Sequence, residues 1–208
     1  MLDYRKIAFL KSATATSHFP DADLPEVAIV GRSNVGKSSL LNMLGDHKGM
    51  ARVSKTPGRT QLINFFTVGD RARIVDLPGY GYADVPENIQ RTWDKMMHDY
   101  LAGRELLLGL LLLIDIRRMP SEHDKMMLGW CFERELPVLI VLTKCDKVGR
   151  NEAFNQQHKI AKDLGISPKQ VIQTSVSKKT GLDALRDSLD ALFDEYFESL
   201  DDSPDEST

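Results

Sequence analysis

Short apolar runs alternate along this chain with longer mixed segments of helical length. The apolar runs predict six strands, at residues 26–30, 61–68, 73–76, 107–115, 137–143 and 170–175. The mixed segments predict five helices, at residues 37–44, 86–101, 121–134, 152–164 and 182–199. Such alternation is typical of an α/β fold with helices on both faces of a mostly parallel sheet. Only residues 69–72 separate the second and third strands, so we expect a hairpin and one antiparallel strand.

One domain accounts for most of the 208 residues. Chains of this length normally bury a single core, and we expect it within residues 23–199. Residues 1–22 form an N-terminal extension for which the pattern predicts no clear element. Residues 200–208 are acidic and almost free of apolar side chains, which predicts a solvated tail.

The composition excludes several classes of protein. With 42% hydrophobic and 27% charged residues, the chain resembles globular domains rather than disordered or disulfide-rich ones. The net charge is −3, but five carboxylates follow residue 197, so residues 1–197 carry +2. The most apolar stretch, residues 106–114, is far shorter than the roughly 20 residues that cross a bilayer. Residues 1–11 lack the apolar core of a signal peptide and the chain has only two cysteines, so we expect a cytoplasmic protein without membrane contact.

The most informative motif follows the first predicted strand and opens a helix. It reads Gly31-Arg32-Ser33-Asn34-Val35-Gly36-Lys37-Ser38 and matches the phosphate-binding pattern G-x-x-x-x-G-K-[ST]. Gly31 and Gly36 let backbone N–H groups converge on phosphate oxygens at the start of the helix. Lys37 suits the β- and γ-phosphates, and the Ser38 hydroxyl suits Mg²⁺. A nucleoside triphosphate is the implied ligand, although ATPases, nucleotide kinases and GTPases all use such a loop.

A second motif bears on the base. Thr143-Lys144-Cys145-Asp146 follows an apolar strand at the sheet edge where nucleotides lie in open α/β folds. The Asp146 carboxylate can accept hydrogen bonds from guanine N1–H and the exocyclic amine together, a pair that adenine does not offer. The methylene stem of Lys144 can cover the base while its ammonium stays solvated. T-K-x-D alone is a weak signal, but with the phosphate loop it favours guanine.

Several further segments resemble those of known GTPases. Asp76-Leu77-Pro78-Gly79 resembles the D-x-x-G element of translation-factor-like GTPases, Thr60 resembles their switch threonine, and Ser175-Val176-Ser177 resembles their base-contacting S-A-K/L loop. More narrowly, the chain resembles the EngB family of small bacterial GTPases, relatives of Era and septins. That resemblance lies in Ser54-Lys55-Thr56-Pro57-Gly58-Arg59-Thr60-Gln61, in residues 76–83 and in Asp115-Ile116-Arg117.

The resemblance implies a Ras-like P-loop domain that binds GTP and GDP and hydrolyses GTP slowly with Mg²⁺. It also implies a role in assembly of the large (50S) ribosomal subunit and in normal cell division and septation. Ser38 and Thr60 would ligate Mg²⁺ directly and Asp76 through a water, while Lys37, Thr60 and Gly79 would serve catalysis. The implied nucleotide contacts are residues 31–38 as named above, Gly58, Arg59, Thr60, Gln61, Leu62, Asp76, Leu77, Pro78, Gly79, Thr143, Lys144, Cys145, Asp146, Ser175, Val176 and Ser177.

The chain departs from the general GTPase pattern at a few positions. Thr143 replaces an Asn, and its shorter side chain puts in question the tether that Asn makes to the phosphate loop. Ser175-Val176-Ser177 departs from S-A-K/L, which leaves backbone amides as the expected base contacts there. Tyr80 stands where Ras-like enzymes have the Gln that orients the attacking water, so we expect slow turnover. Similar GTPases use an Asn at the position of Asn34 to hold K⁺, and we hypothesise the same here.

Alternatives remain open at this point. The chain could be a non-catalytic GTP-binding scaffold, because the Gln is missing, or a P-loop kinase, against which Asp146 argues. Tyr80 could anchor a partner, shield the γ-phosphate or pack under its loop, and Cys145 could be reactive or buried. We expect a monomer. Basic residues in loops could meet ribosomal RNA or be scattered solvated charge; they are Lys48, Arg52, Lys55, Arg59, Arg117, Arg118, Lys147, Arg150, Lys178 and Lys179.

Overall fold

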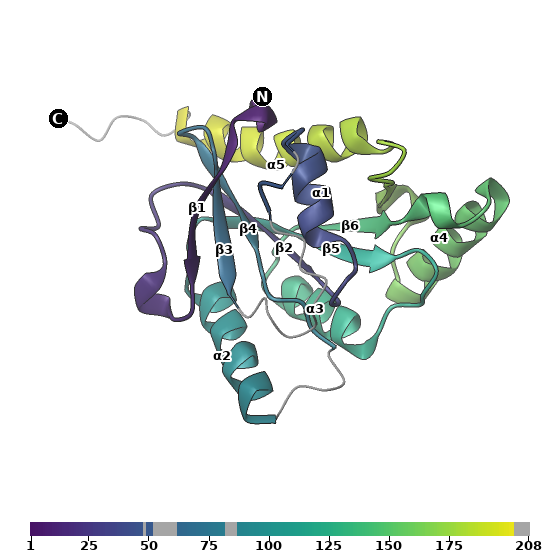
Figure 1. Ribbon diagram of the computed structural model, residues 1–208, viewed down its shortest axis with the longest axis horizontal. Coiled ribbons are helices and arrows are strands. Elements are labelled where there is room, and N and C mark those ends of the chain that lie inside the picture. Colours follow the sequence, from purple (N-terminus) through teal and green to yellow (C-terminus); the bar gives the residue numbers. More distant parts are fainter. Residues whose placement is uncertain (48, 52–61, 82–86, 202–208) are drawn as a thin grey trace.

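A seven-stranded sheet forms the centre of the molecule (Figure 1). The computed structural model describes residues 1–47, 49–51, 62–81 and 87–201, with side chains of the second helix from Lys95 onward. In spatial order the strands are β1 (Ile7–Ala13), β3 (Ile63–Val68), β4 (Ala72–Asp76), β2 (Glu26–Gly31), β5 (Leu107–Asp115), β6 (Val138–Thr143) and β7 (Val171–Gln173). In the described part of the chain, β3 alone runs against the others, because it pairs antiparallel with both β1 and β4.

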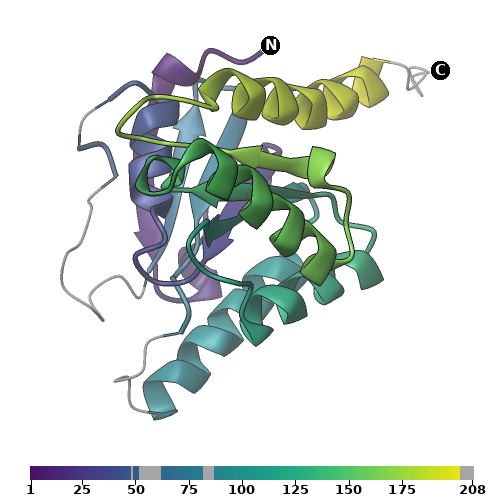
Figure 2. The same cartoon turned by 90° about the vertical axis from the view of Figure 1, so that its right-hand side faces the viewer.

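Five helices cover the two faces of the sheet within the described residues (Figures 1 and 2). α1 (Lys37–Leu44) and α5 (Leu182–Asp201) pack on one face, and α2 (Glu87–Gly103), α3 (Glu122–Glu133) and α4 (Arg150–Leu164) pack on the other. The short 3₁₀ turns are η1 (Tyr4–Lys6), η2 (Thr16–His18), η3 (Cys145–Lys147) and η4 (Pro168–Gln170). None of the helices in these described ranges is long and apolar enough to span a membrane.

The alternation of side chains along each strand builds two separate cores. In β2, Val27 and Ile29 point into the core beneath α1 and α5, whereas Ala28 and Val30 point into the core beneath α2, α3 and α4. The leucines of β5 divide in the same way. Because both faces of a central parallel strand are covered, the strand reads as a continuous apolar run in the sequence.

The predicted fold class is confirmed, including the single antiparallel strand, but the expected count of six strands was one short. The missing strand is β1, at the edge of the sheet beside β3. Its residues Ala8, Phe9 and Leu10 are all exposed, and the register shifts between Phe9 and Lys11. An edge strand with a bulge has no clean alternation of apolar and polar residues, so the pattern gave no signal.

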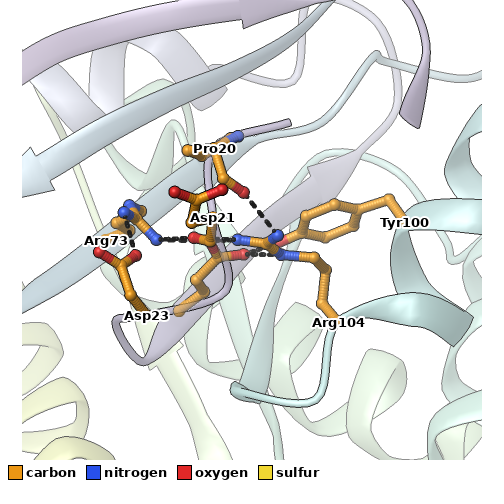
Figure 3. A network of polar contacts seen from close by, with 7 residues as sticks. Pro20, Asp21, Asp23, Arg73, Tyr100 and Arg104 are labelled. Carbon is orange, nitrogen blue, oxygen red and sulfur yellow. Dashed lines mark hydrogen bonds and ion pairs between the residues drawn. The ribbon is translucent and has the colours of Figure 1, made fainter. Parts of the chain in front are cut away.

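A polar network closes the end of β2 that lies away from Gly31 (Figure 3). Glu26 is fully buried and accepts hydrogen bonds from Tyr100 Oη at 2.8 Å and from Arg104. Arg73 lies 3.5 Å from the same carboxylate and pairs with Asp23 at 2.6 Å. Two guanidinium groups thus balance one buried carboxylate, and Tyr100 joins the last turn of α2 to the start of β2.

Candidate functional site

The predicted motifs converge at the edge formed by the carboxyl ends of the parallel strands. Gly31 ends β2, Asp76 ends β4, and Thr143 ends β6. Direct contacts join the three segments: Thr143 to the carbonyl of Val35, and Ser38 to Asp76. Ligands of open α/β sheets bind at this edge, beyond the strand ends. Residues more than 100 positions apart in sequence therefore share one site.

The phosphate loop requires glycine at both ends. Gly36 is the N-cap of α1 and has a φ of 119°, a left-handed conformation that favours glycine. It has no side chain with which to cap the helix. Gly31 has a φ of 151°, and a Cβ there would lie 2.7 Å from the carbonyl oxygen of Leu113. The first-turn amides of α1 therefore have no capping side chain among the described residues. An uncapped helix start with a glycine-rich approach is a ready site for an anion.

Ser38 and Asp76 lie side by side below this loop. The Ser38 hydroxyl donates to Asp76 Oδ2 at 3.4 Å. Asp76 is 4% exposed, and its Oδ1 has no hydrogen-bond partner among the described residues. Burial raises the pKa of this carboxyl, and the nearby charge of Lys37 opposes that shift. A buried carboxylate with an open oxygen next to a hydroxyl fits a hard divalent cation such as Mg²⁺.

Asp146 supplies a fixed carboxylate on the other side of the site. Its Oδ1 accepts a hydrogen bond from Ser175 Oγ at 2.7 Å, and Lys147 lies 3.3 Å from Oδ2. Hydrogen bonds lower the pKa of Asp146 to about 2, and the bond from Ser175 is the largest of these causes, ahead of those from Ser177 and Lys147. The carboxylate is therefore ionised at neutral pH and held in one orientation, as recognition of paired N–H donors requires.

Thr143 tethers the base-side segment to the phosphate loop. Its Oγ1 donates to the carbonyl oxygen of Val35 at 2.8 Å, in a fully packed position. The concern that a threonine is too short for this tether was wrong, because β6 ends directly against the loop. The structure reaches the same connection with a shorter side chain.

Lys144 makes a second connection between the two segments. Its ammonium donates to the carbonyl oxygen of Asn34 at 2.7 Å and lies 2.9 Å from Asp115. Asp115 also accepts two hydrogen bonds from the guanidinium of Arg117. Burial opposes ionisation of Asp115, but the bonds from Arg117 and Lys144 outweigh it and hold its pKa well below the usual range. Beside this cluster lies a cavity of about 310 Å³ that also contacts Arg32.

The remaining predicted residues are distributed as follows. Gly58, Arg59, Thr60 and Gln61 lie outside the described residues. Leu62 is half-buried just before β3, and Leu77 is buried. Cys145 is half-buried, and burial raises its pKa to about 11, which favours the buried interpretation over a reactive thiolate.

Comparison with known proteins gives the family. A family model described as "50S ribosome-binding GTPase" matches residues 26–144, more than half of the chain. A probable GTP-binding protein EngB of Geobacter sulfurreducens is 45% identical over 205 residues, which cover 98% of this chain and 100% of that protein. The counterpart in Trichlorobacter lovleyi is 51% identical over 180 residues, 85% of this chain and 90% of that protein. The chain belongs to the EngB family of GTP-binding proteins.

Solved structures agree with this EngB assignment at the level of the fold. A crystal structure of a probable GTP-binding protein EngB matches with a TM-score of 0.68 at 21% identity, over 82% of this chain and 99% of that one. Era in complex with MgGDPNP and nucleotides 1506–1542 of 16S ribosomal RNA matches with a TM-score of 0.63 at 24% identity, over 80% of this chain and 55% of that one. The architecture is that of a Ras-like P-loop GTPase.

Sequence reasoning missed two supporting residues of this EngB-type site, Asp115 and Asp124, and the role of a third. Ser175 was an expected contact, but only through its backbone, whereas its hydroxyl bonds Asp146. Asp115 was noted only as part of a family motif, yet it holds Lys144. Asp124 on α3 accepts a hydrogen bond from Tyr80 and was not expected at the site. An acidic residue three positions after Ser121 is a recognisable helix-capping pattern, but the pattern does not reveal the Tyr80 contact.

Proposed function

We propose that this EngB-family protein binds GTP, hydrolyses it slowly to GDP, and acts as a switch in assembly of the large ribosomal subunit. One observation carries the proposal: a phosphate loop, a buried Ser38–Asp76 pair and an ionised Asp146 meet at one edge of the sheet. The phosphate loop suits the phosphates, the Ser38–Asp76 pair suits a metal ion, and Asp146 suits guanine. A P-loop kinase would not need a carboxylate such as that of Asp146.

Binding of the triphosphate would use residues that the loop already orients. Lys37 and the first-turn amides of α1 would neutralise the phosphates. When bound, Mg²⁺ would supply positive charge that offsets the negative charge developing on the phosphates. In our proposal Ser38 and Thr60 ligate it directly and Asp76 through water; the open Oδ1 of Asp76 supports the last assignment. The Gly79 amide would respond to the γ-phosphate, as the position of Gly79 over the loop suggests.

Hydrolysis would be slow because no described side chain takes the place of the usual Gln. Tyr80 donates its hydroxyl to Asp124 at 2.5 Å, and burial with the charge of Asp124 raises its pKa, so it does not act as a base. This observation also keeps the non-catalytic scaffold as a second candidate. Release of inorganic phosphate from GTP at single-turnover concentrations distinguishes the slow GTPase from the scaffold. Phosphate release supports the GTPase, and stable GTP supports the scaffold.

Asn34 is the residue that we propose to hold K⁺. It is exposed, with a φ of 59°, and its side chain makes no hydrogen bond within the described part of the chain. An amide oxygen next to the phosphates could bind a monovalent cation that stabilises the charge of the transition state. Faster phosphate release in KCl than in NaCl is the expected result; equal rates would contradict the assignment.

Partners are proposed from charge and from family membership. Arg118, Arg150 and Lys178 are exposed and have no acidic partner within the described residues, whereas Lys147 and Lys179 pair with aspartates. Unpaired cations near the site can contact RNA phosphates of a ribosomal subunit. Binding to purified 50S subunits should weaken as salt increases, and a flat response would contradict an RNA contact. A role in normal cell division and septation is proposed from the family resemblance alone.

A further inference from the structure

Tyr80 joins the Asp76–Tyr80 loop to two other elements. Its backbone carbonyl accepts a hydrogen bond from the Ser33 amide of the phosphate loop at 2.9 Å. Its hydroxyl donates to Asp124 Oδ1 on α3 at 2.5 Å. The ring stacks on His123, with centroids 5.7 Å apart and planes 21° from parallel. Tyr80 therefore fastens the end of this loop both to the phosphate loop and to α3.

Asp124 is a rigid acceptor for this hydroxyl. It is 1% exposed, and its Oδ2 accepts hydrogen bonds from the Ser121 amide and hydroxyl, both at 2.6 Å. The bond from the Ser121 amide is one half of the capping box at the start of α3, and the bond from the Asp124 amide to Ser121 Oγ at 3.4 Å is the other half. Asp124 cannot follow a displaced Tyr80 without uncapping the helix, so movement of the loop has to break the Tyr80–Asp124 bond.

In this position the loop covers the groups that a third phosphate needs. A Cβ built on Gly79 would lie 3.0 Å from Lys37 Nζ and 3.0 Å from the Ser33 nitrogen. A phosphate oxygen that bonds either group needs about the same distance, with its phosphorus and other oxygens beyond it. While the loop stays here, the Ser33 amide is occupied by the Tyr80 carbonyl and Gly79 crowds the space beside Lys37, so the loop has to shift before the Gly79 amide can meet a γ-phosphate. A β-phosphate would lie deeper, against the amides at the start of α1.

We propose that the Tyr80–Asp124 hydrogen bond is a latch that sets how strongly this protein distinguishes GTP from GDP. The inference rests on the proposed function, because it concerns the same nucleotide site. GDP binds with the latch closed, whereas GTP binds only after the loop has left the phosphate loop. Part of the binding free energy of the γ-phosphate is thus used to break the bond, which lowers the apparent affinity for GTP.

The test compares Tyr80→Phe with a matched control at the other end of the sheet. Tyr100 makes the same kind of buried bond, from its hydroxyl to Glu26 at 2.8 Å, away from the nucleotide site (Figure 3). Dissociation constants of GDP and a non-hydrolysable GTP analogue are measured by calorimetry for the wild type, Tyr80→Phe and Tyr100→Phe, with Mg²⁺ present. The ratio Kd(GDP)/Kd(analogue) should rise about tenfold in Tyr80→Phe and stay within about twofold in Tyr100→Phe.

A second variant covers the case in which Tyr80→Phe does not fold. Asp124→Asn keeps an oxygen for the helix cap but replaces the charged acceptor, so the ratio should rise by a smaller factor. An unchanged or reduced ratio in the folded variants, or an equal rise in Tyr100→Phe, would overturn the latch. The wild type tests the proposed function separately. If it binds ATP as well as GTP, the proposed function fails. If it is specific for guanine nucleotides but the ratio Kd(GDP)/Kd(analogue) does not change in Tyr80→Phe, only the latch is rejected.

Discussion

At the scale of single residues, the proposed site depends on the ionisation and the orientation of the Asp146 carboxylate. A carboxylate recognises guanine only if it is ionised and oriented, because it has to accept from two neighbouring N–H groups at once. Ser175 provides the orientation through a 2.7 Å hydrogen bond, and the same bond is the largest of the causes that lower the pKa of Asp146 to about 2. In our proposal Ser175 is thus a positioning residue for recognition of the base.

Replacing Asp146 by Asn should change base preference from guanine to xanthine. The Asn amide donates where the carboxylate accepted, and xanthine carries a carbonyl in place of the guanine amine. Loss of a charged hydrogen bond should weaken GTP binding by about 100-fold, while binding of xanthosine triphosphate strengthens. Competition binding with the two nucleotides measures the change. Unaltered GTP affinity would show that Asp146 does not contact the base.

The low pKa of Asp146 also predicts a pH-dependent contribution to stability. A carboxyl with a folded pKa of about 2, below the ordinary value of 3.8, stabilises the fold when it is ionised. This contribution is complete above about pH 4 and is lost as the pH falls through about 2. Ser175→Ala removes the main cause of the shift. In urea unfolding, the difference in free energy of unfolding between wild type and Ser175→Ala should be constant from pH 5 to 7 and shrink between pH 4 and 2. A difference that stays constant down to pH 2 would contradict this assignment.

The motifs made some site residues predictable and left others hidden. Lys37, Ser38 and Asp146 could be placed from sequence because each lies within a short motif whose spacing follows from the chemistry. Asp115 and Asp124 could not, because their roles depend on Lys144 and Tyr80, which are distant in sequence and become neighbours only in the fold. Thr60 is still a prediction, since it lies outside the described residues.

At the scale of elements, the phosphate loop is fastened to β6. Thr143 ends that strand and bonds the Val35 carbonyl, and Lys144 bonds the next carbonyl along the loop, that of Asn34. The two contacts fix the distance between the segment that would bind the phosphates and the segment that would bind the base. A rigid spacing of this kind preorganises the site for a ligand with a fixed distance between its phosphates and its base.

Thr143→Val should loosen this connection without changing the volume of the side chain much. The buried carbonyl of Val35 would lose its partner, which costs about 1–3 kcal/mol of unfolding free energy, and guanine-nucleotide affinity should fall with it. Urea unfolding and GDP calorimetry measure the two effects. Thr143→Ser, which keeps the hydroxyl, is the control and should retain most of the affinity. Equal behaviour of both variants would show that the hydroxyl is not the tether.

Element prediction succeeded where periodicity was strong. The long apolar run of β5 and the apolar stripe of α5, with Leu185, Leu189 and Phe193 fully buried, both follow from burial against the sheet. β1 was missed because exposed edge residues interrupt its alternation. β7 is three residues long, shorter than the expected 170–175, and α5 continues to Asp201, two residues into the expected tail.

At the scale of the whole molecule, the N-terminal residues are part of the folded core. Leu2, Tyr4 and Ile7 are buried beside α5. Asp190 of α5 accepts hydrogen bonds from the Leu2 amide and the Tyr4 hydroxyl, and the views in Figures 1 and 2 both place this end of the chain beside α5. The first strand then covers the edge of β3.

Removing residues 1–13 should therefore destabilise the protein severely. The three buried side chains alone account for about 4 kcal/mol or more of hydrophobic free energy, and β3 would become an open edge prone to association. Removing residues 202–208, expected from their composition to be solvated, should leave the melting temperature unchanged. Thermal unfolding of both truncated forms measures the contrast. A small effect of the first deletion would contradict the role of the N-terminal segment.

The central claim is that one edge of the sheet holds a guanine nucleotide, with its phosphates at Lys37 and its base at Asp146. Competition calorimetry tests it most directly, with GDP bound to the wild-type protein in Mg²⁺ and challenged by GTP, ATP and xanthosine triphosphate. The account predicts that GTP displaces GDP, that ATP fails to do so even at a 100-fold excess, and that Lys37→Ala abolishes tight binding of the triphosphate. Displacement by ATP as effective as that by GTP would contradict it.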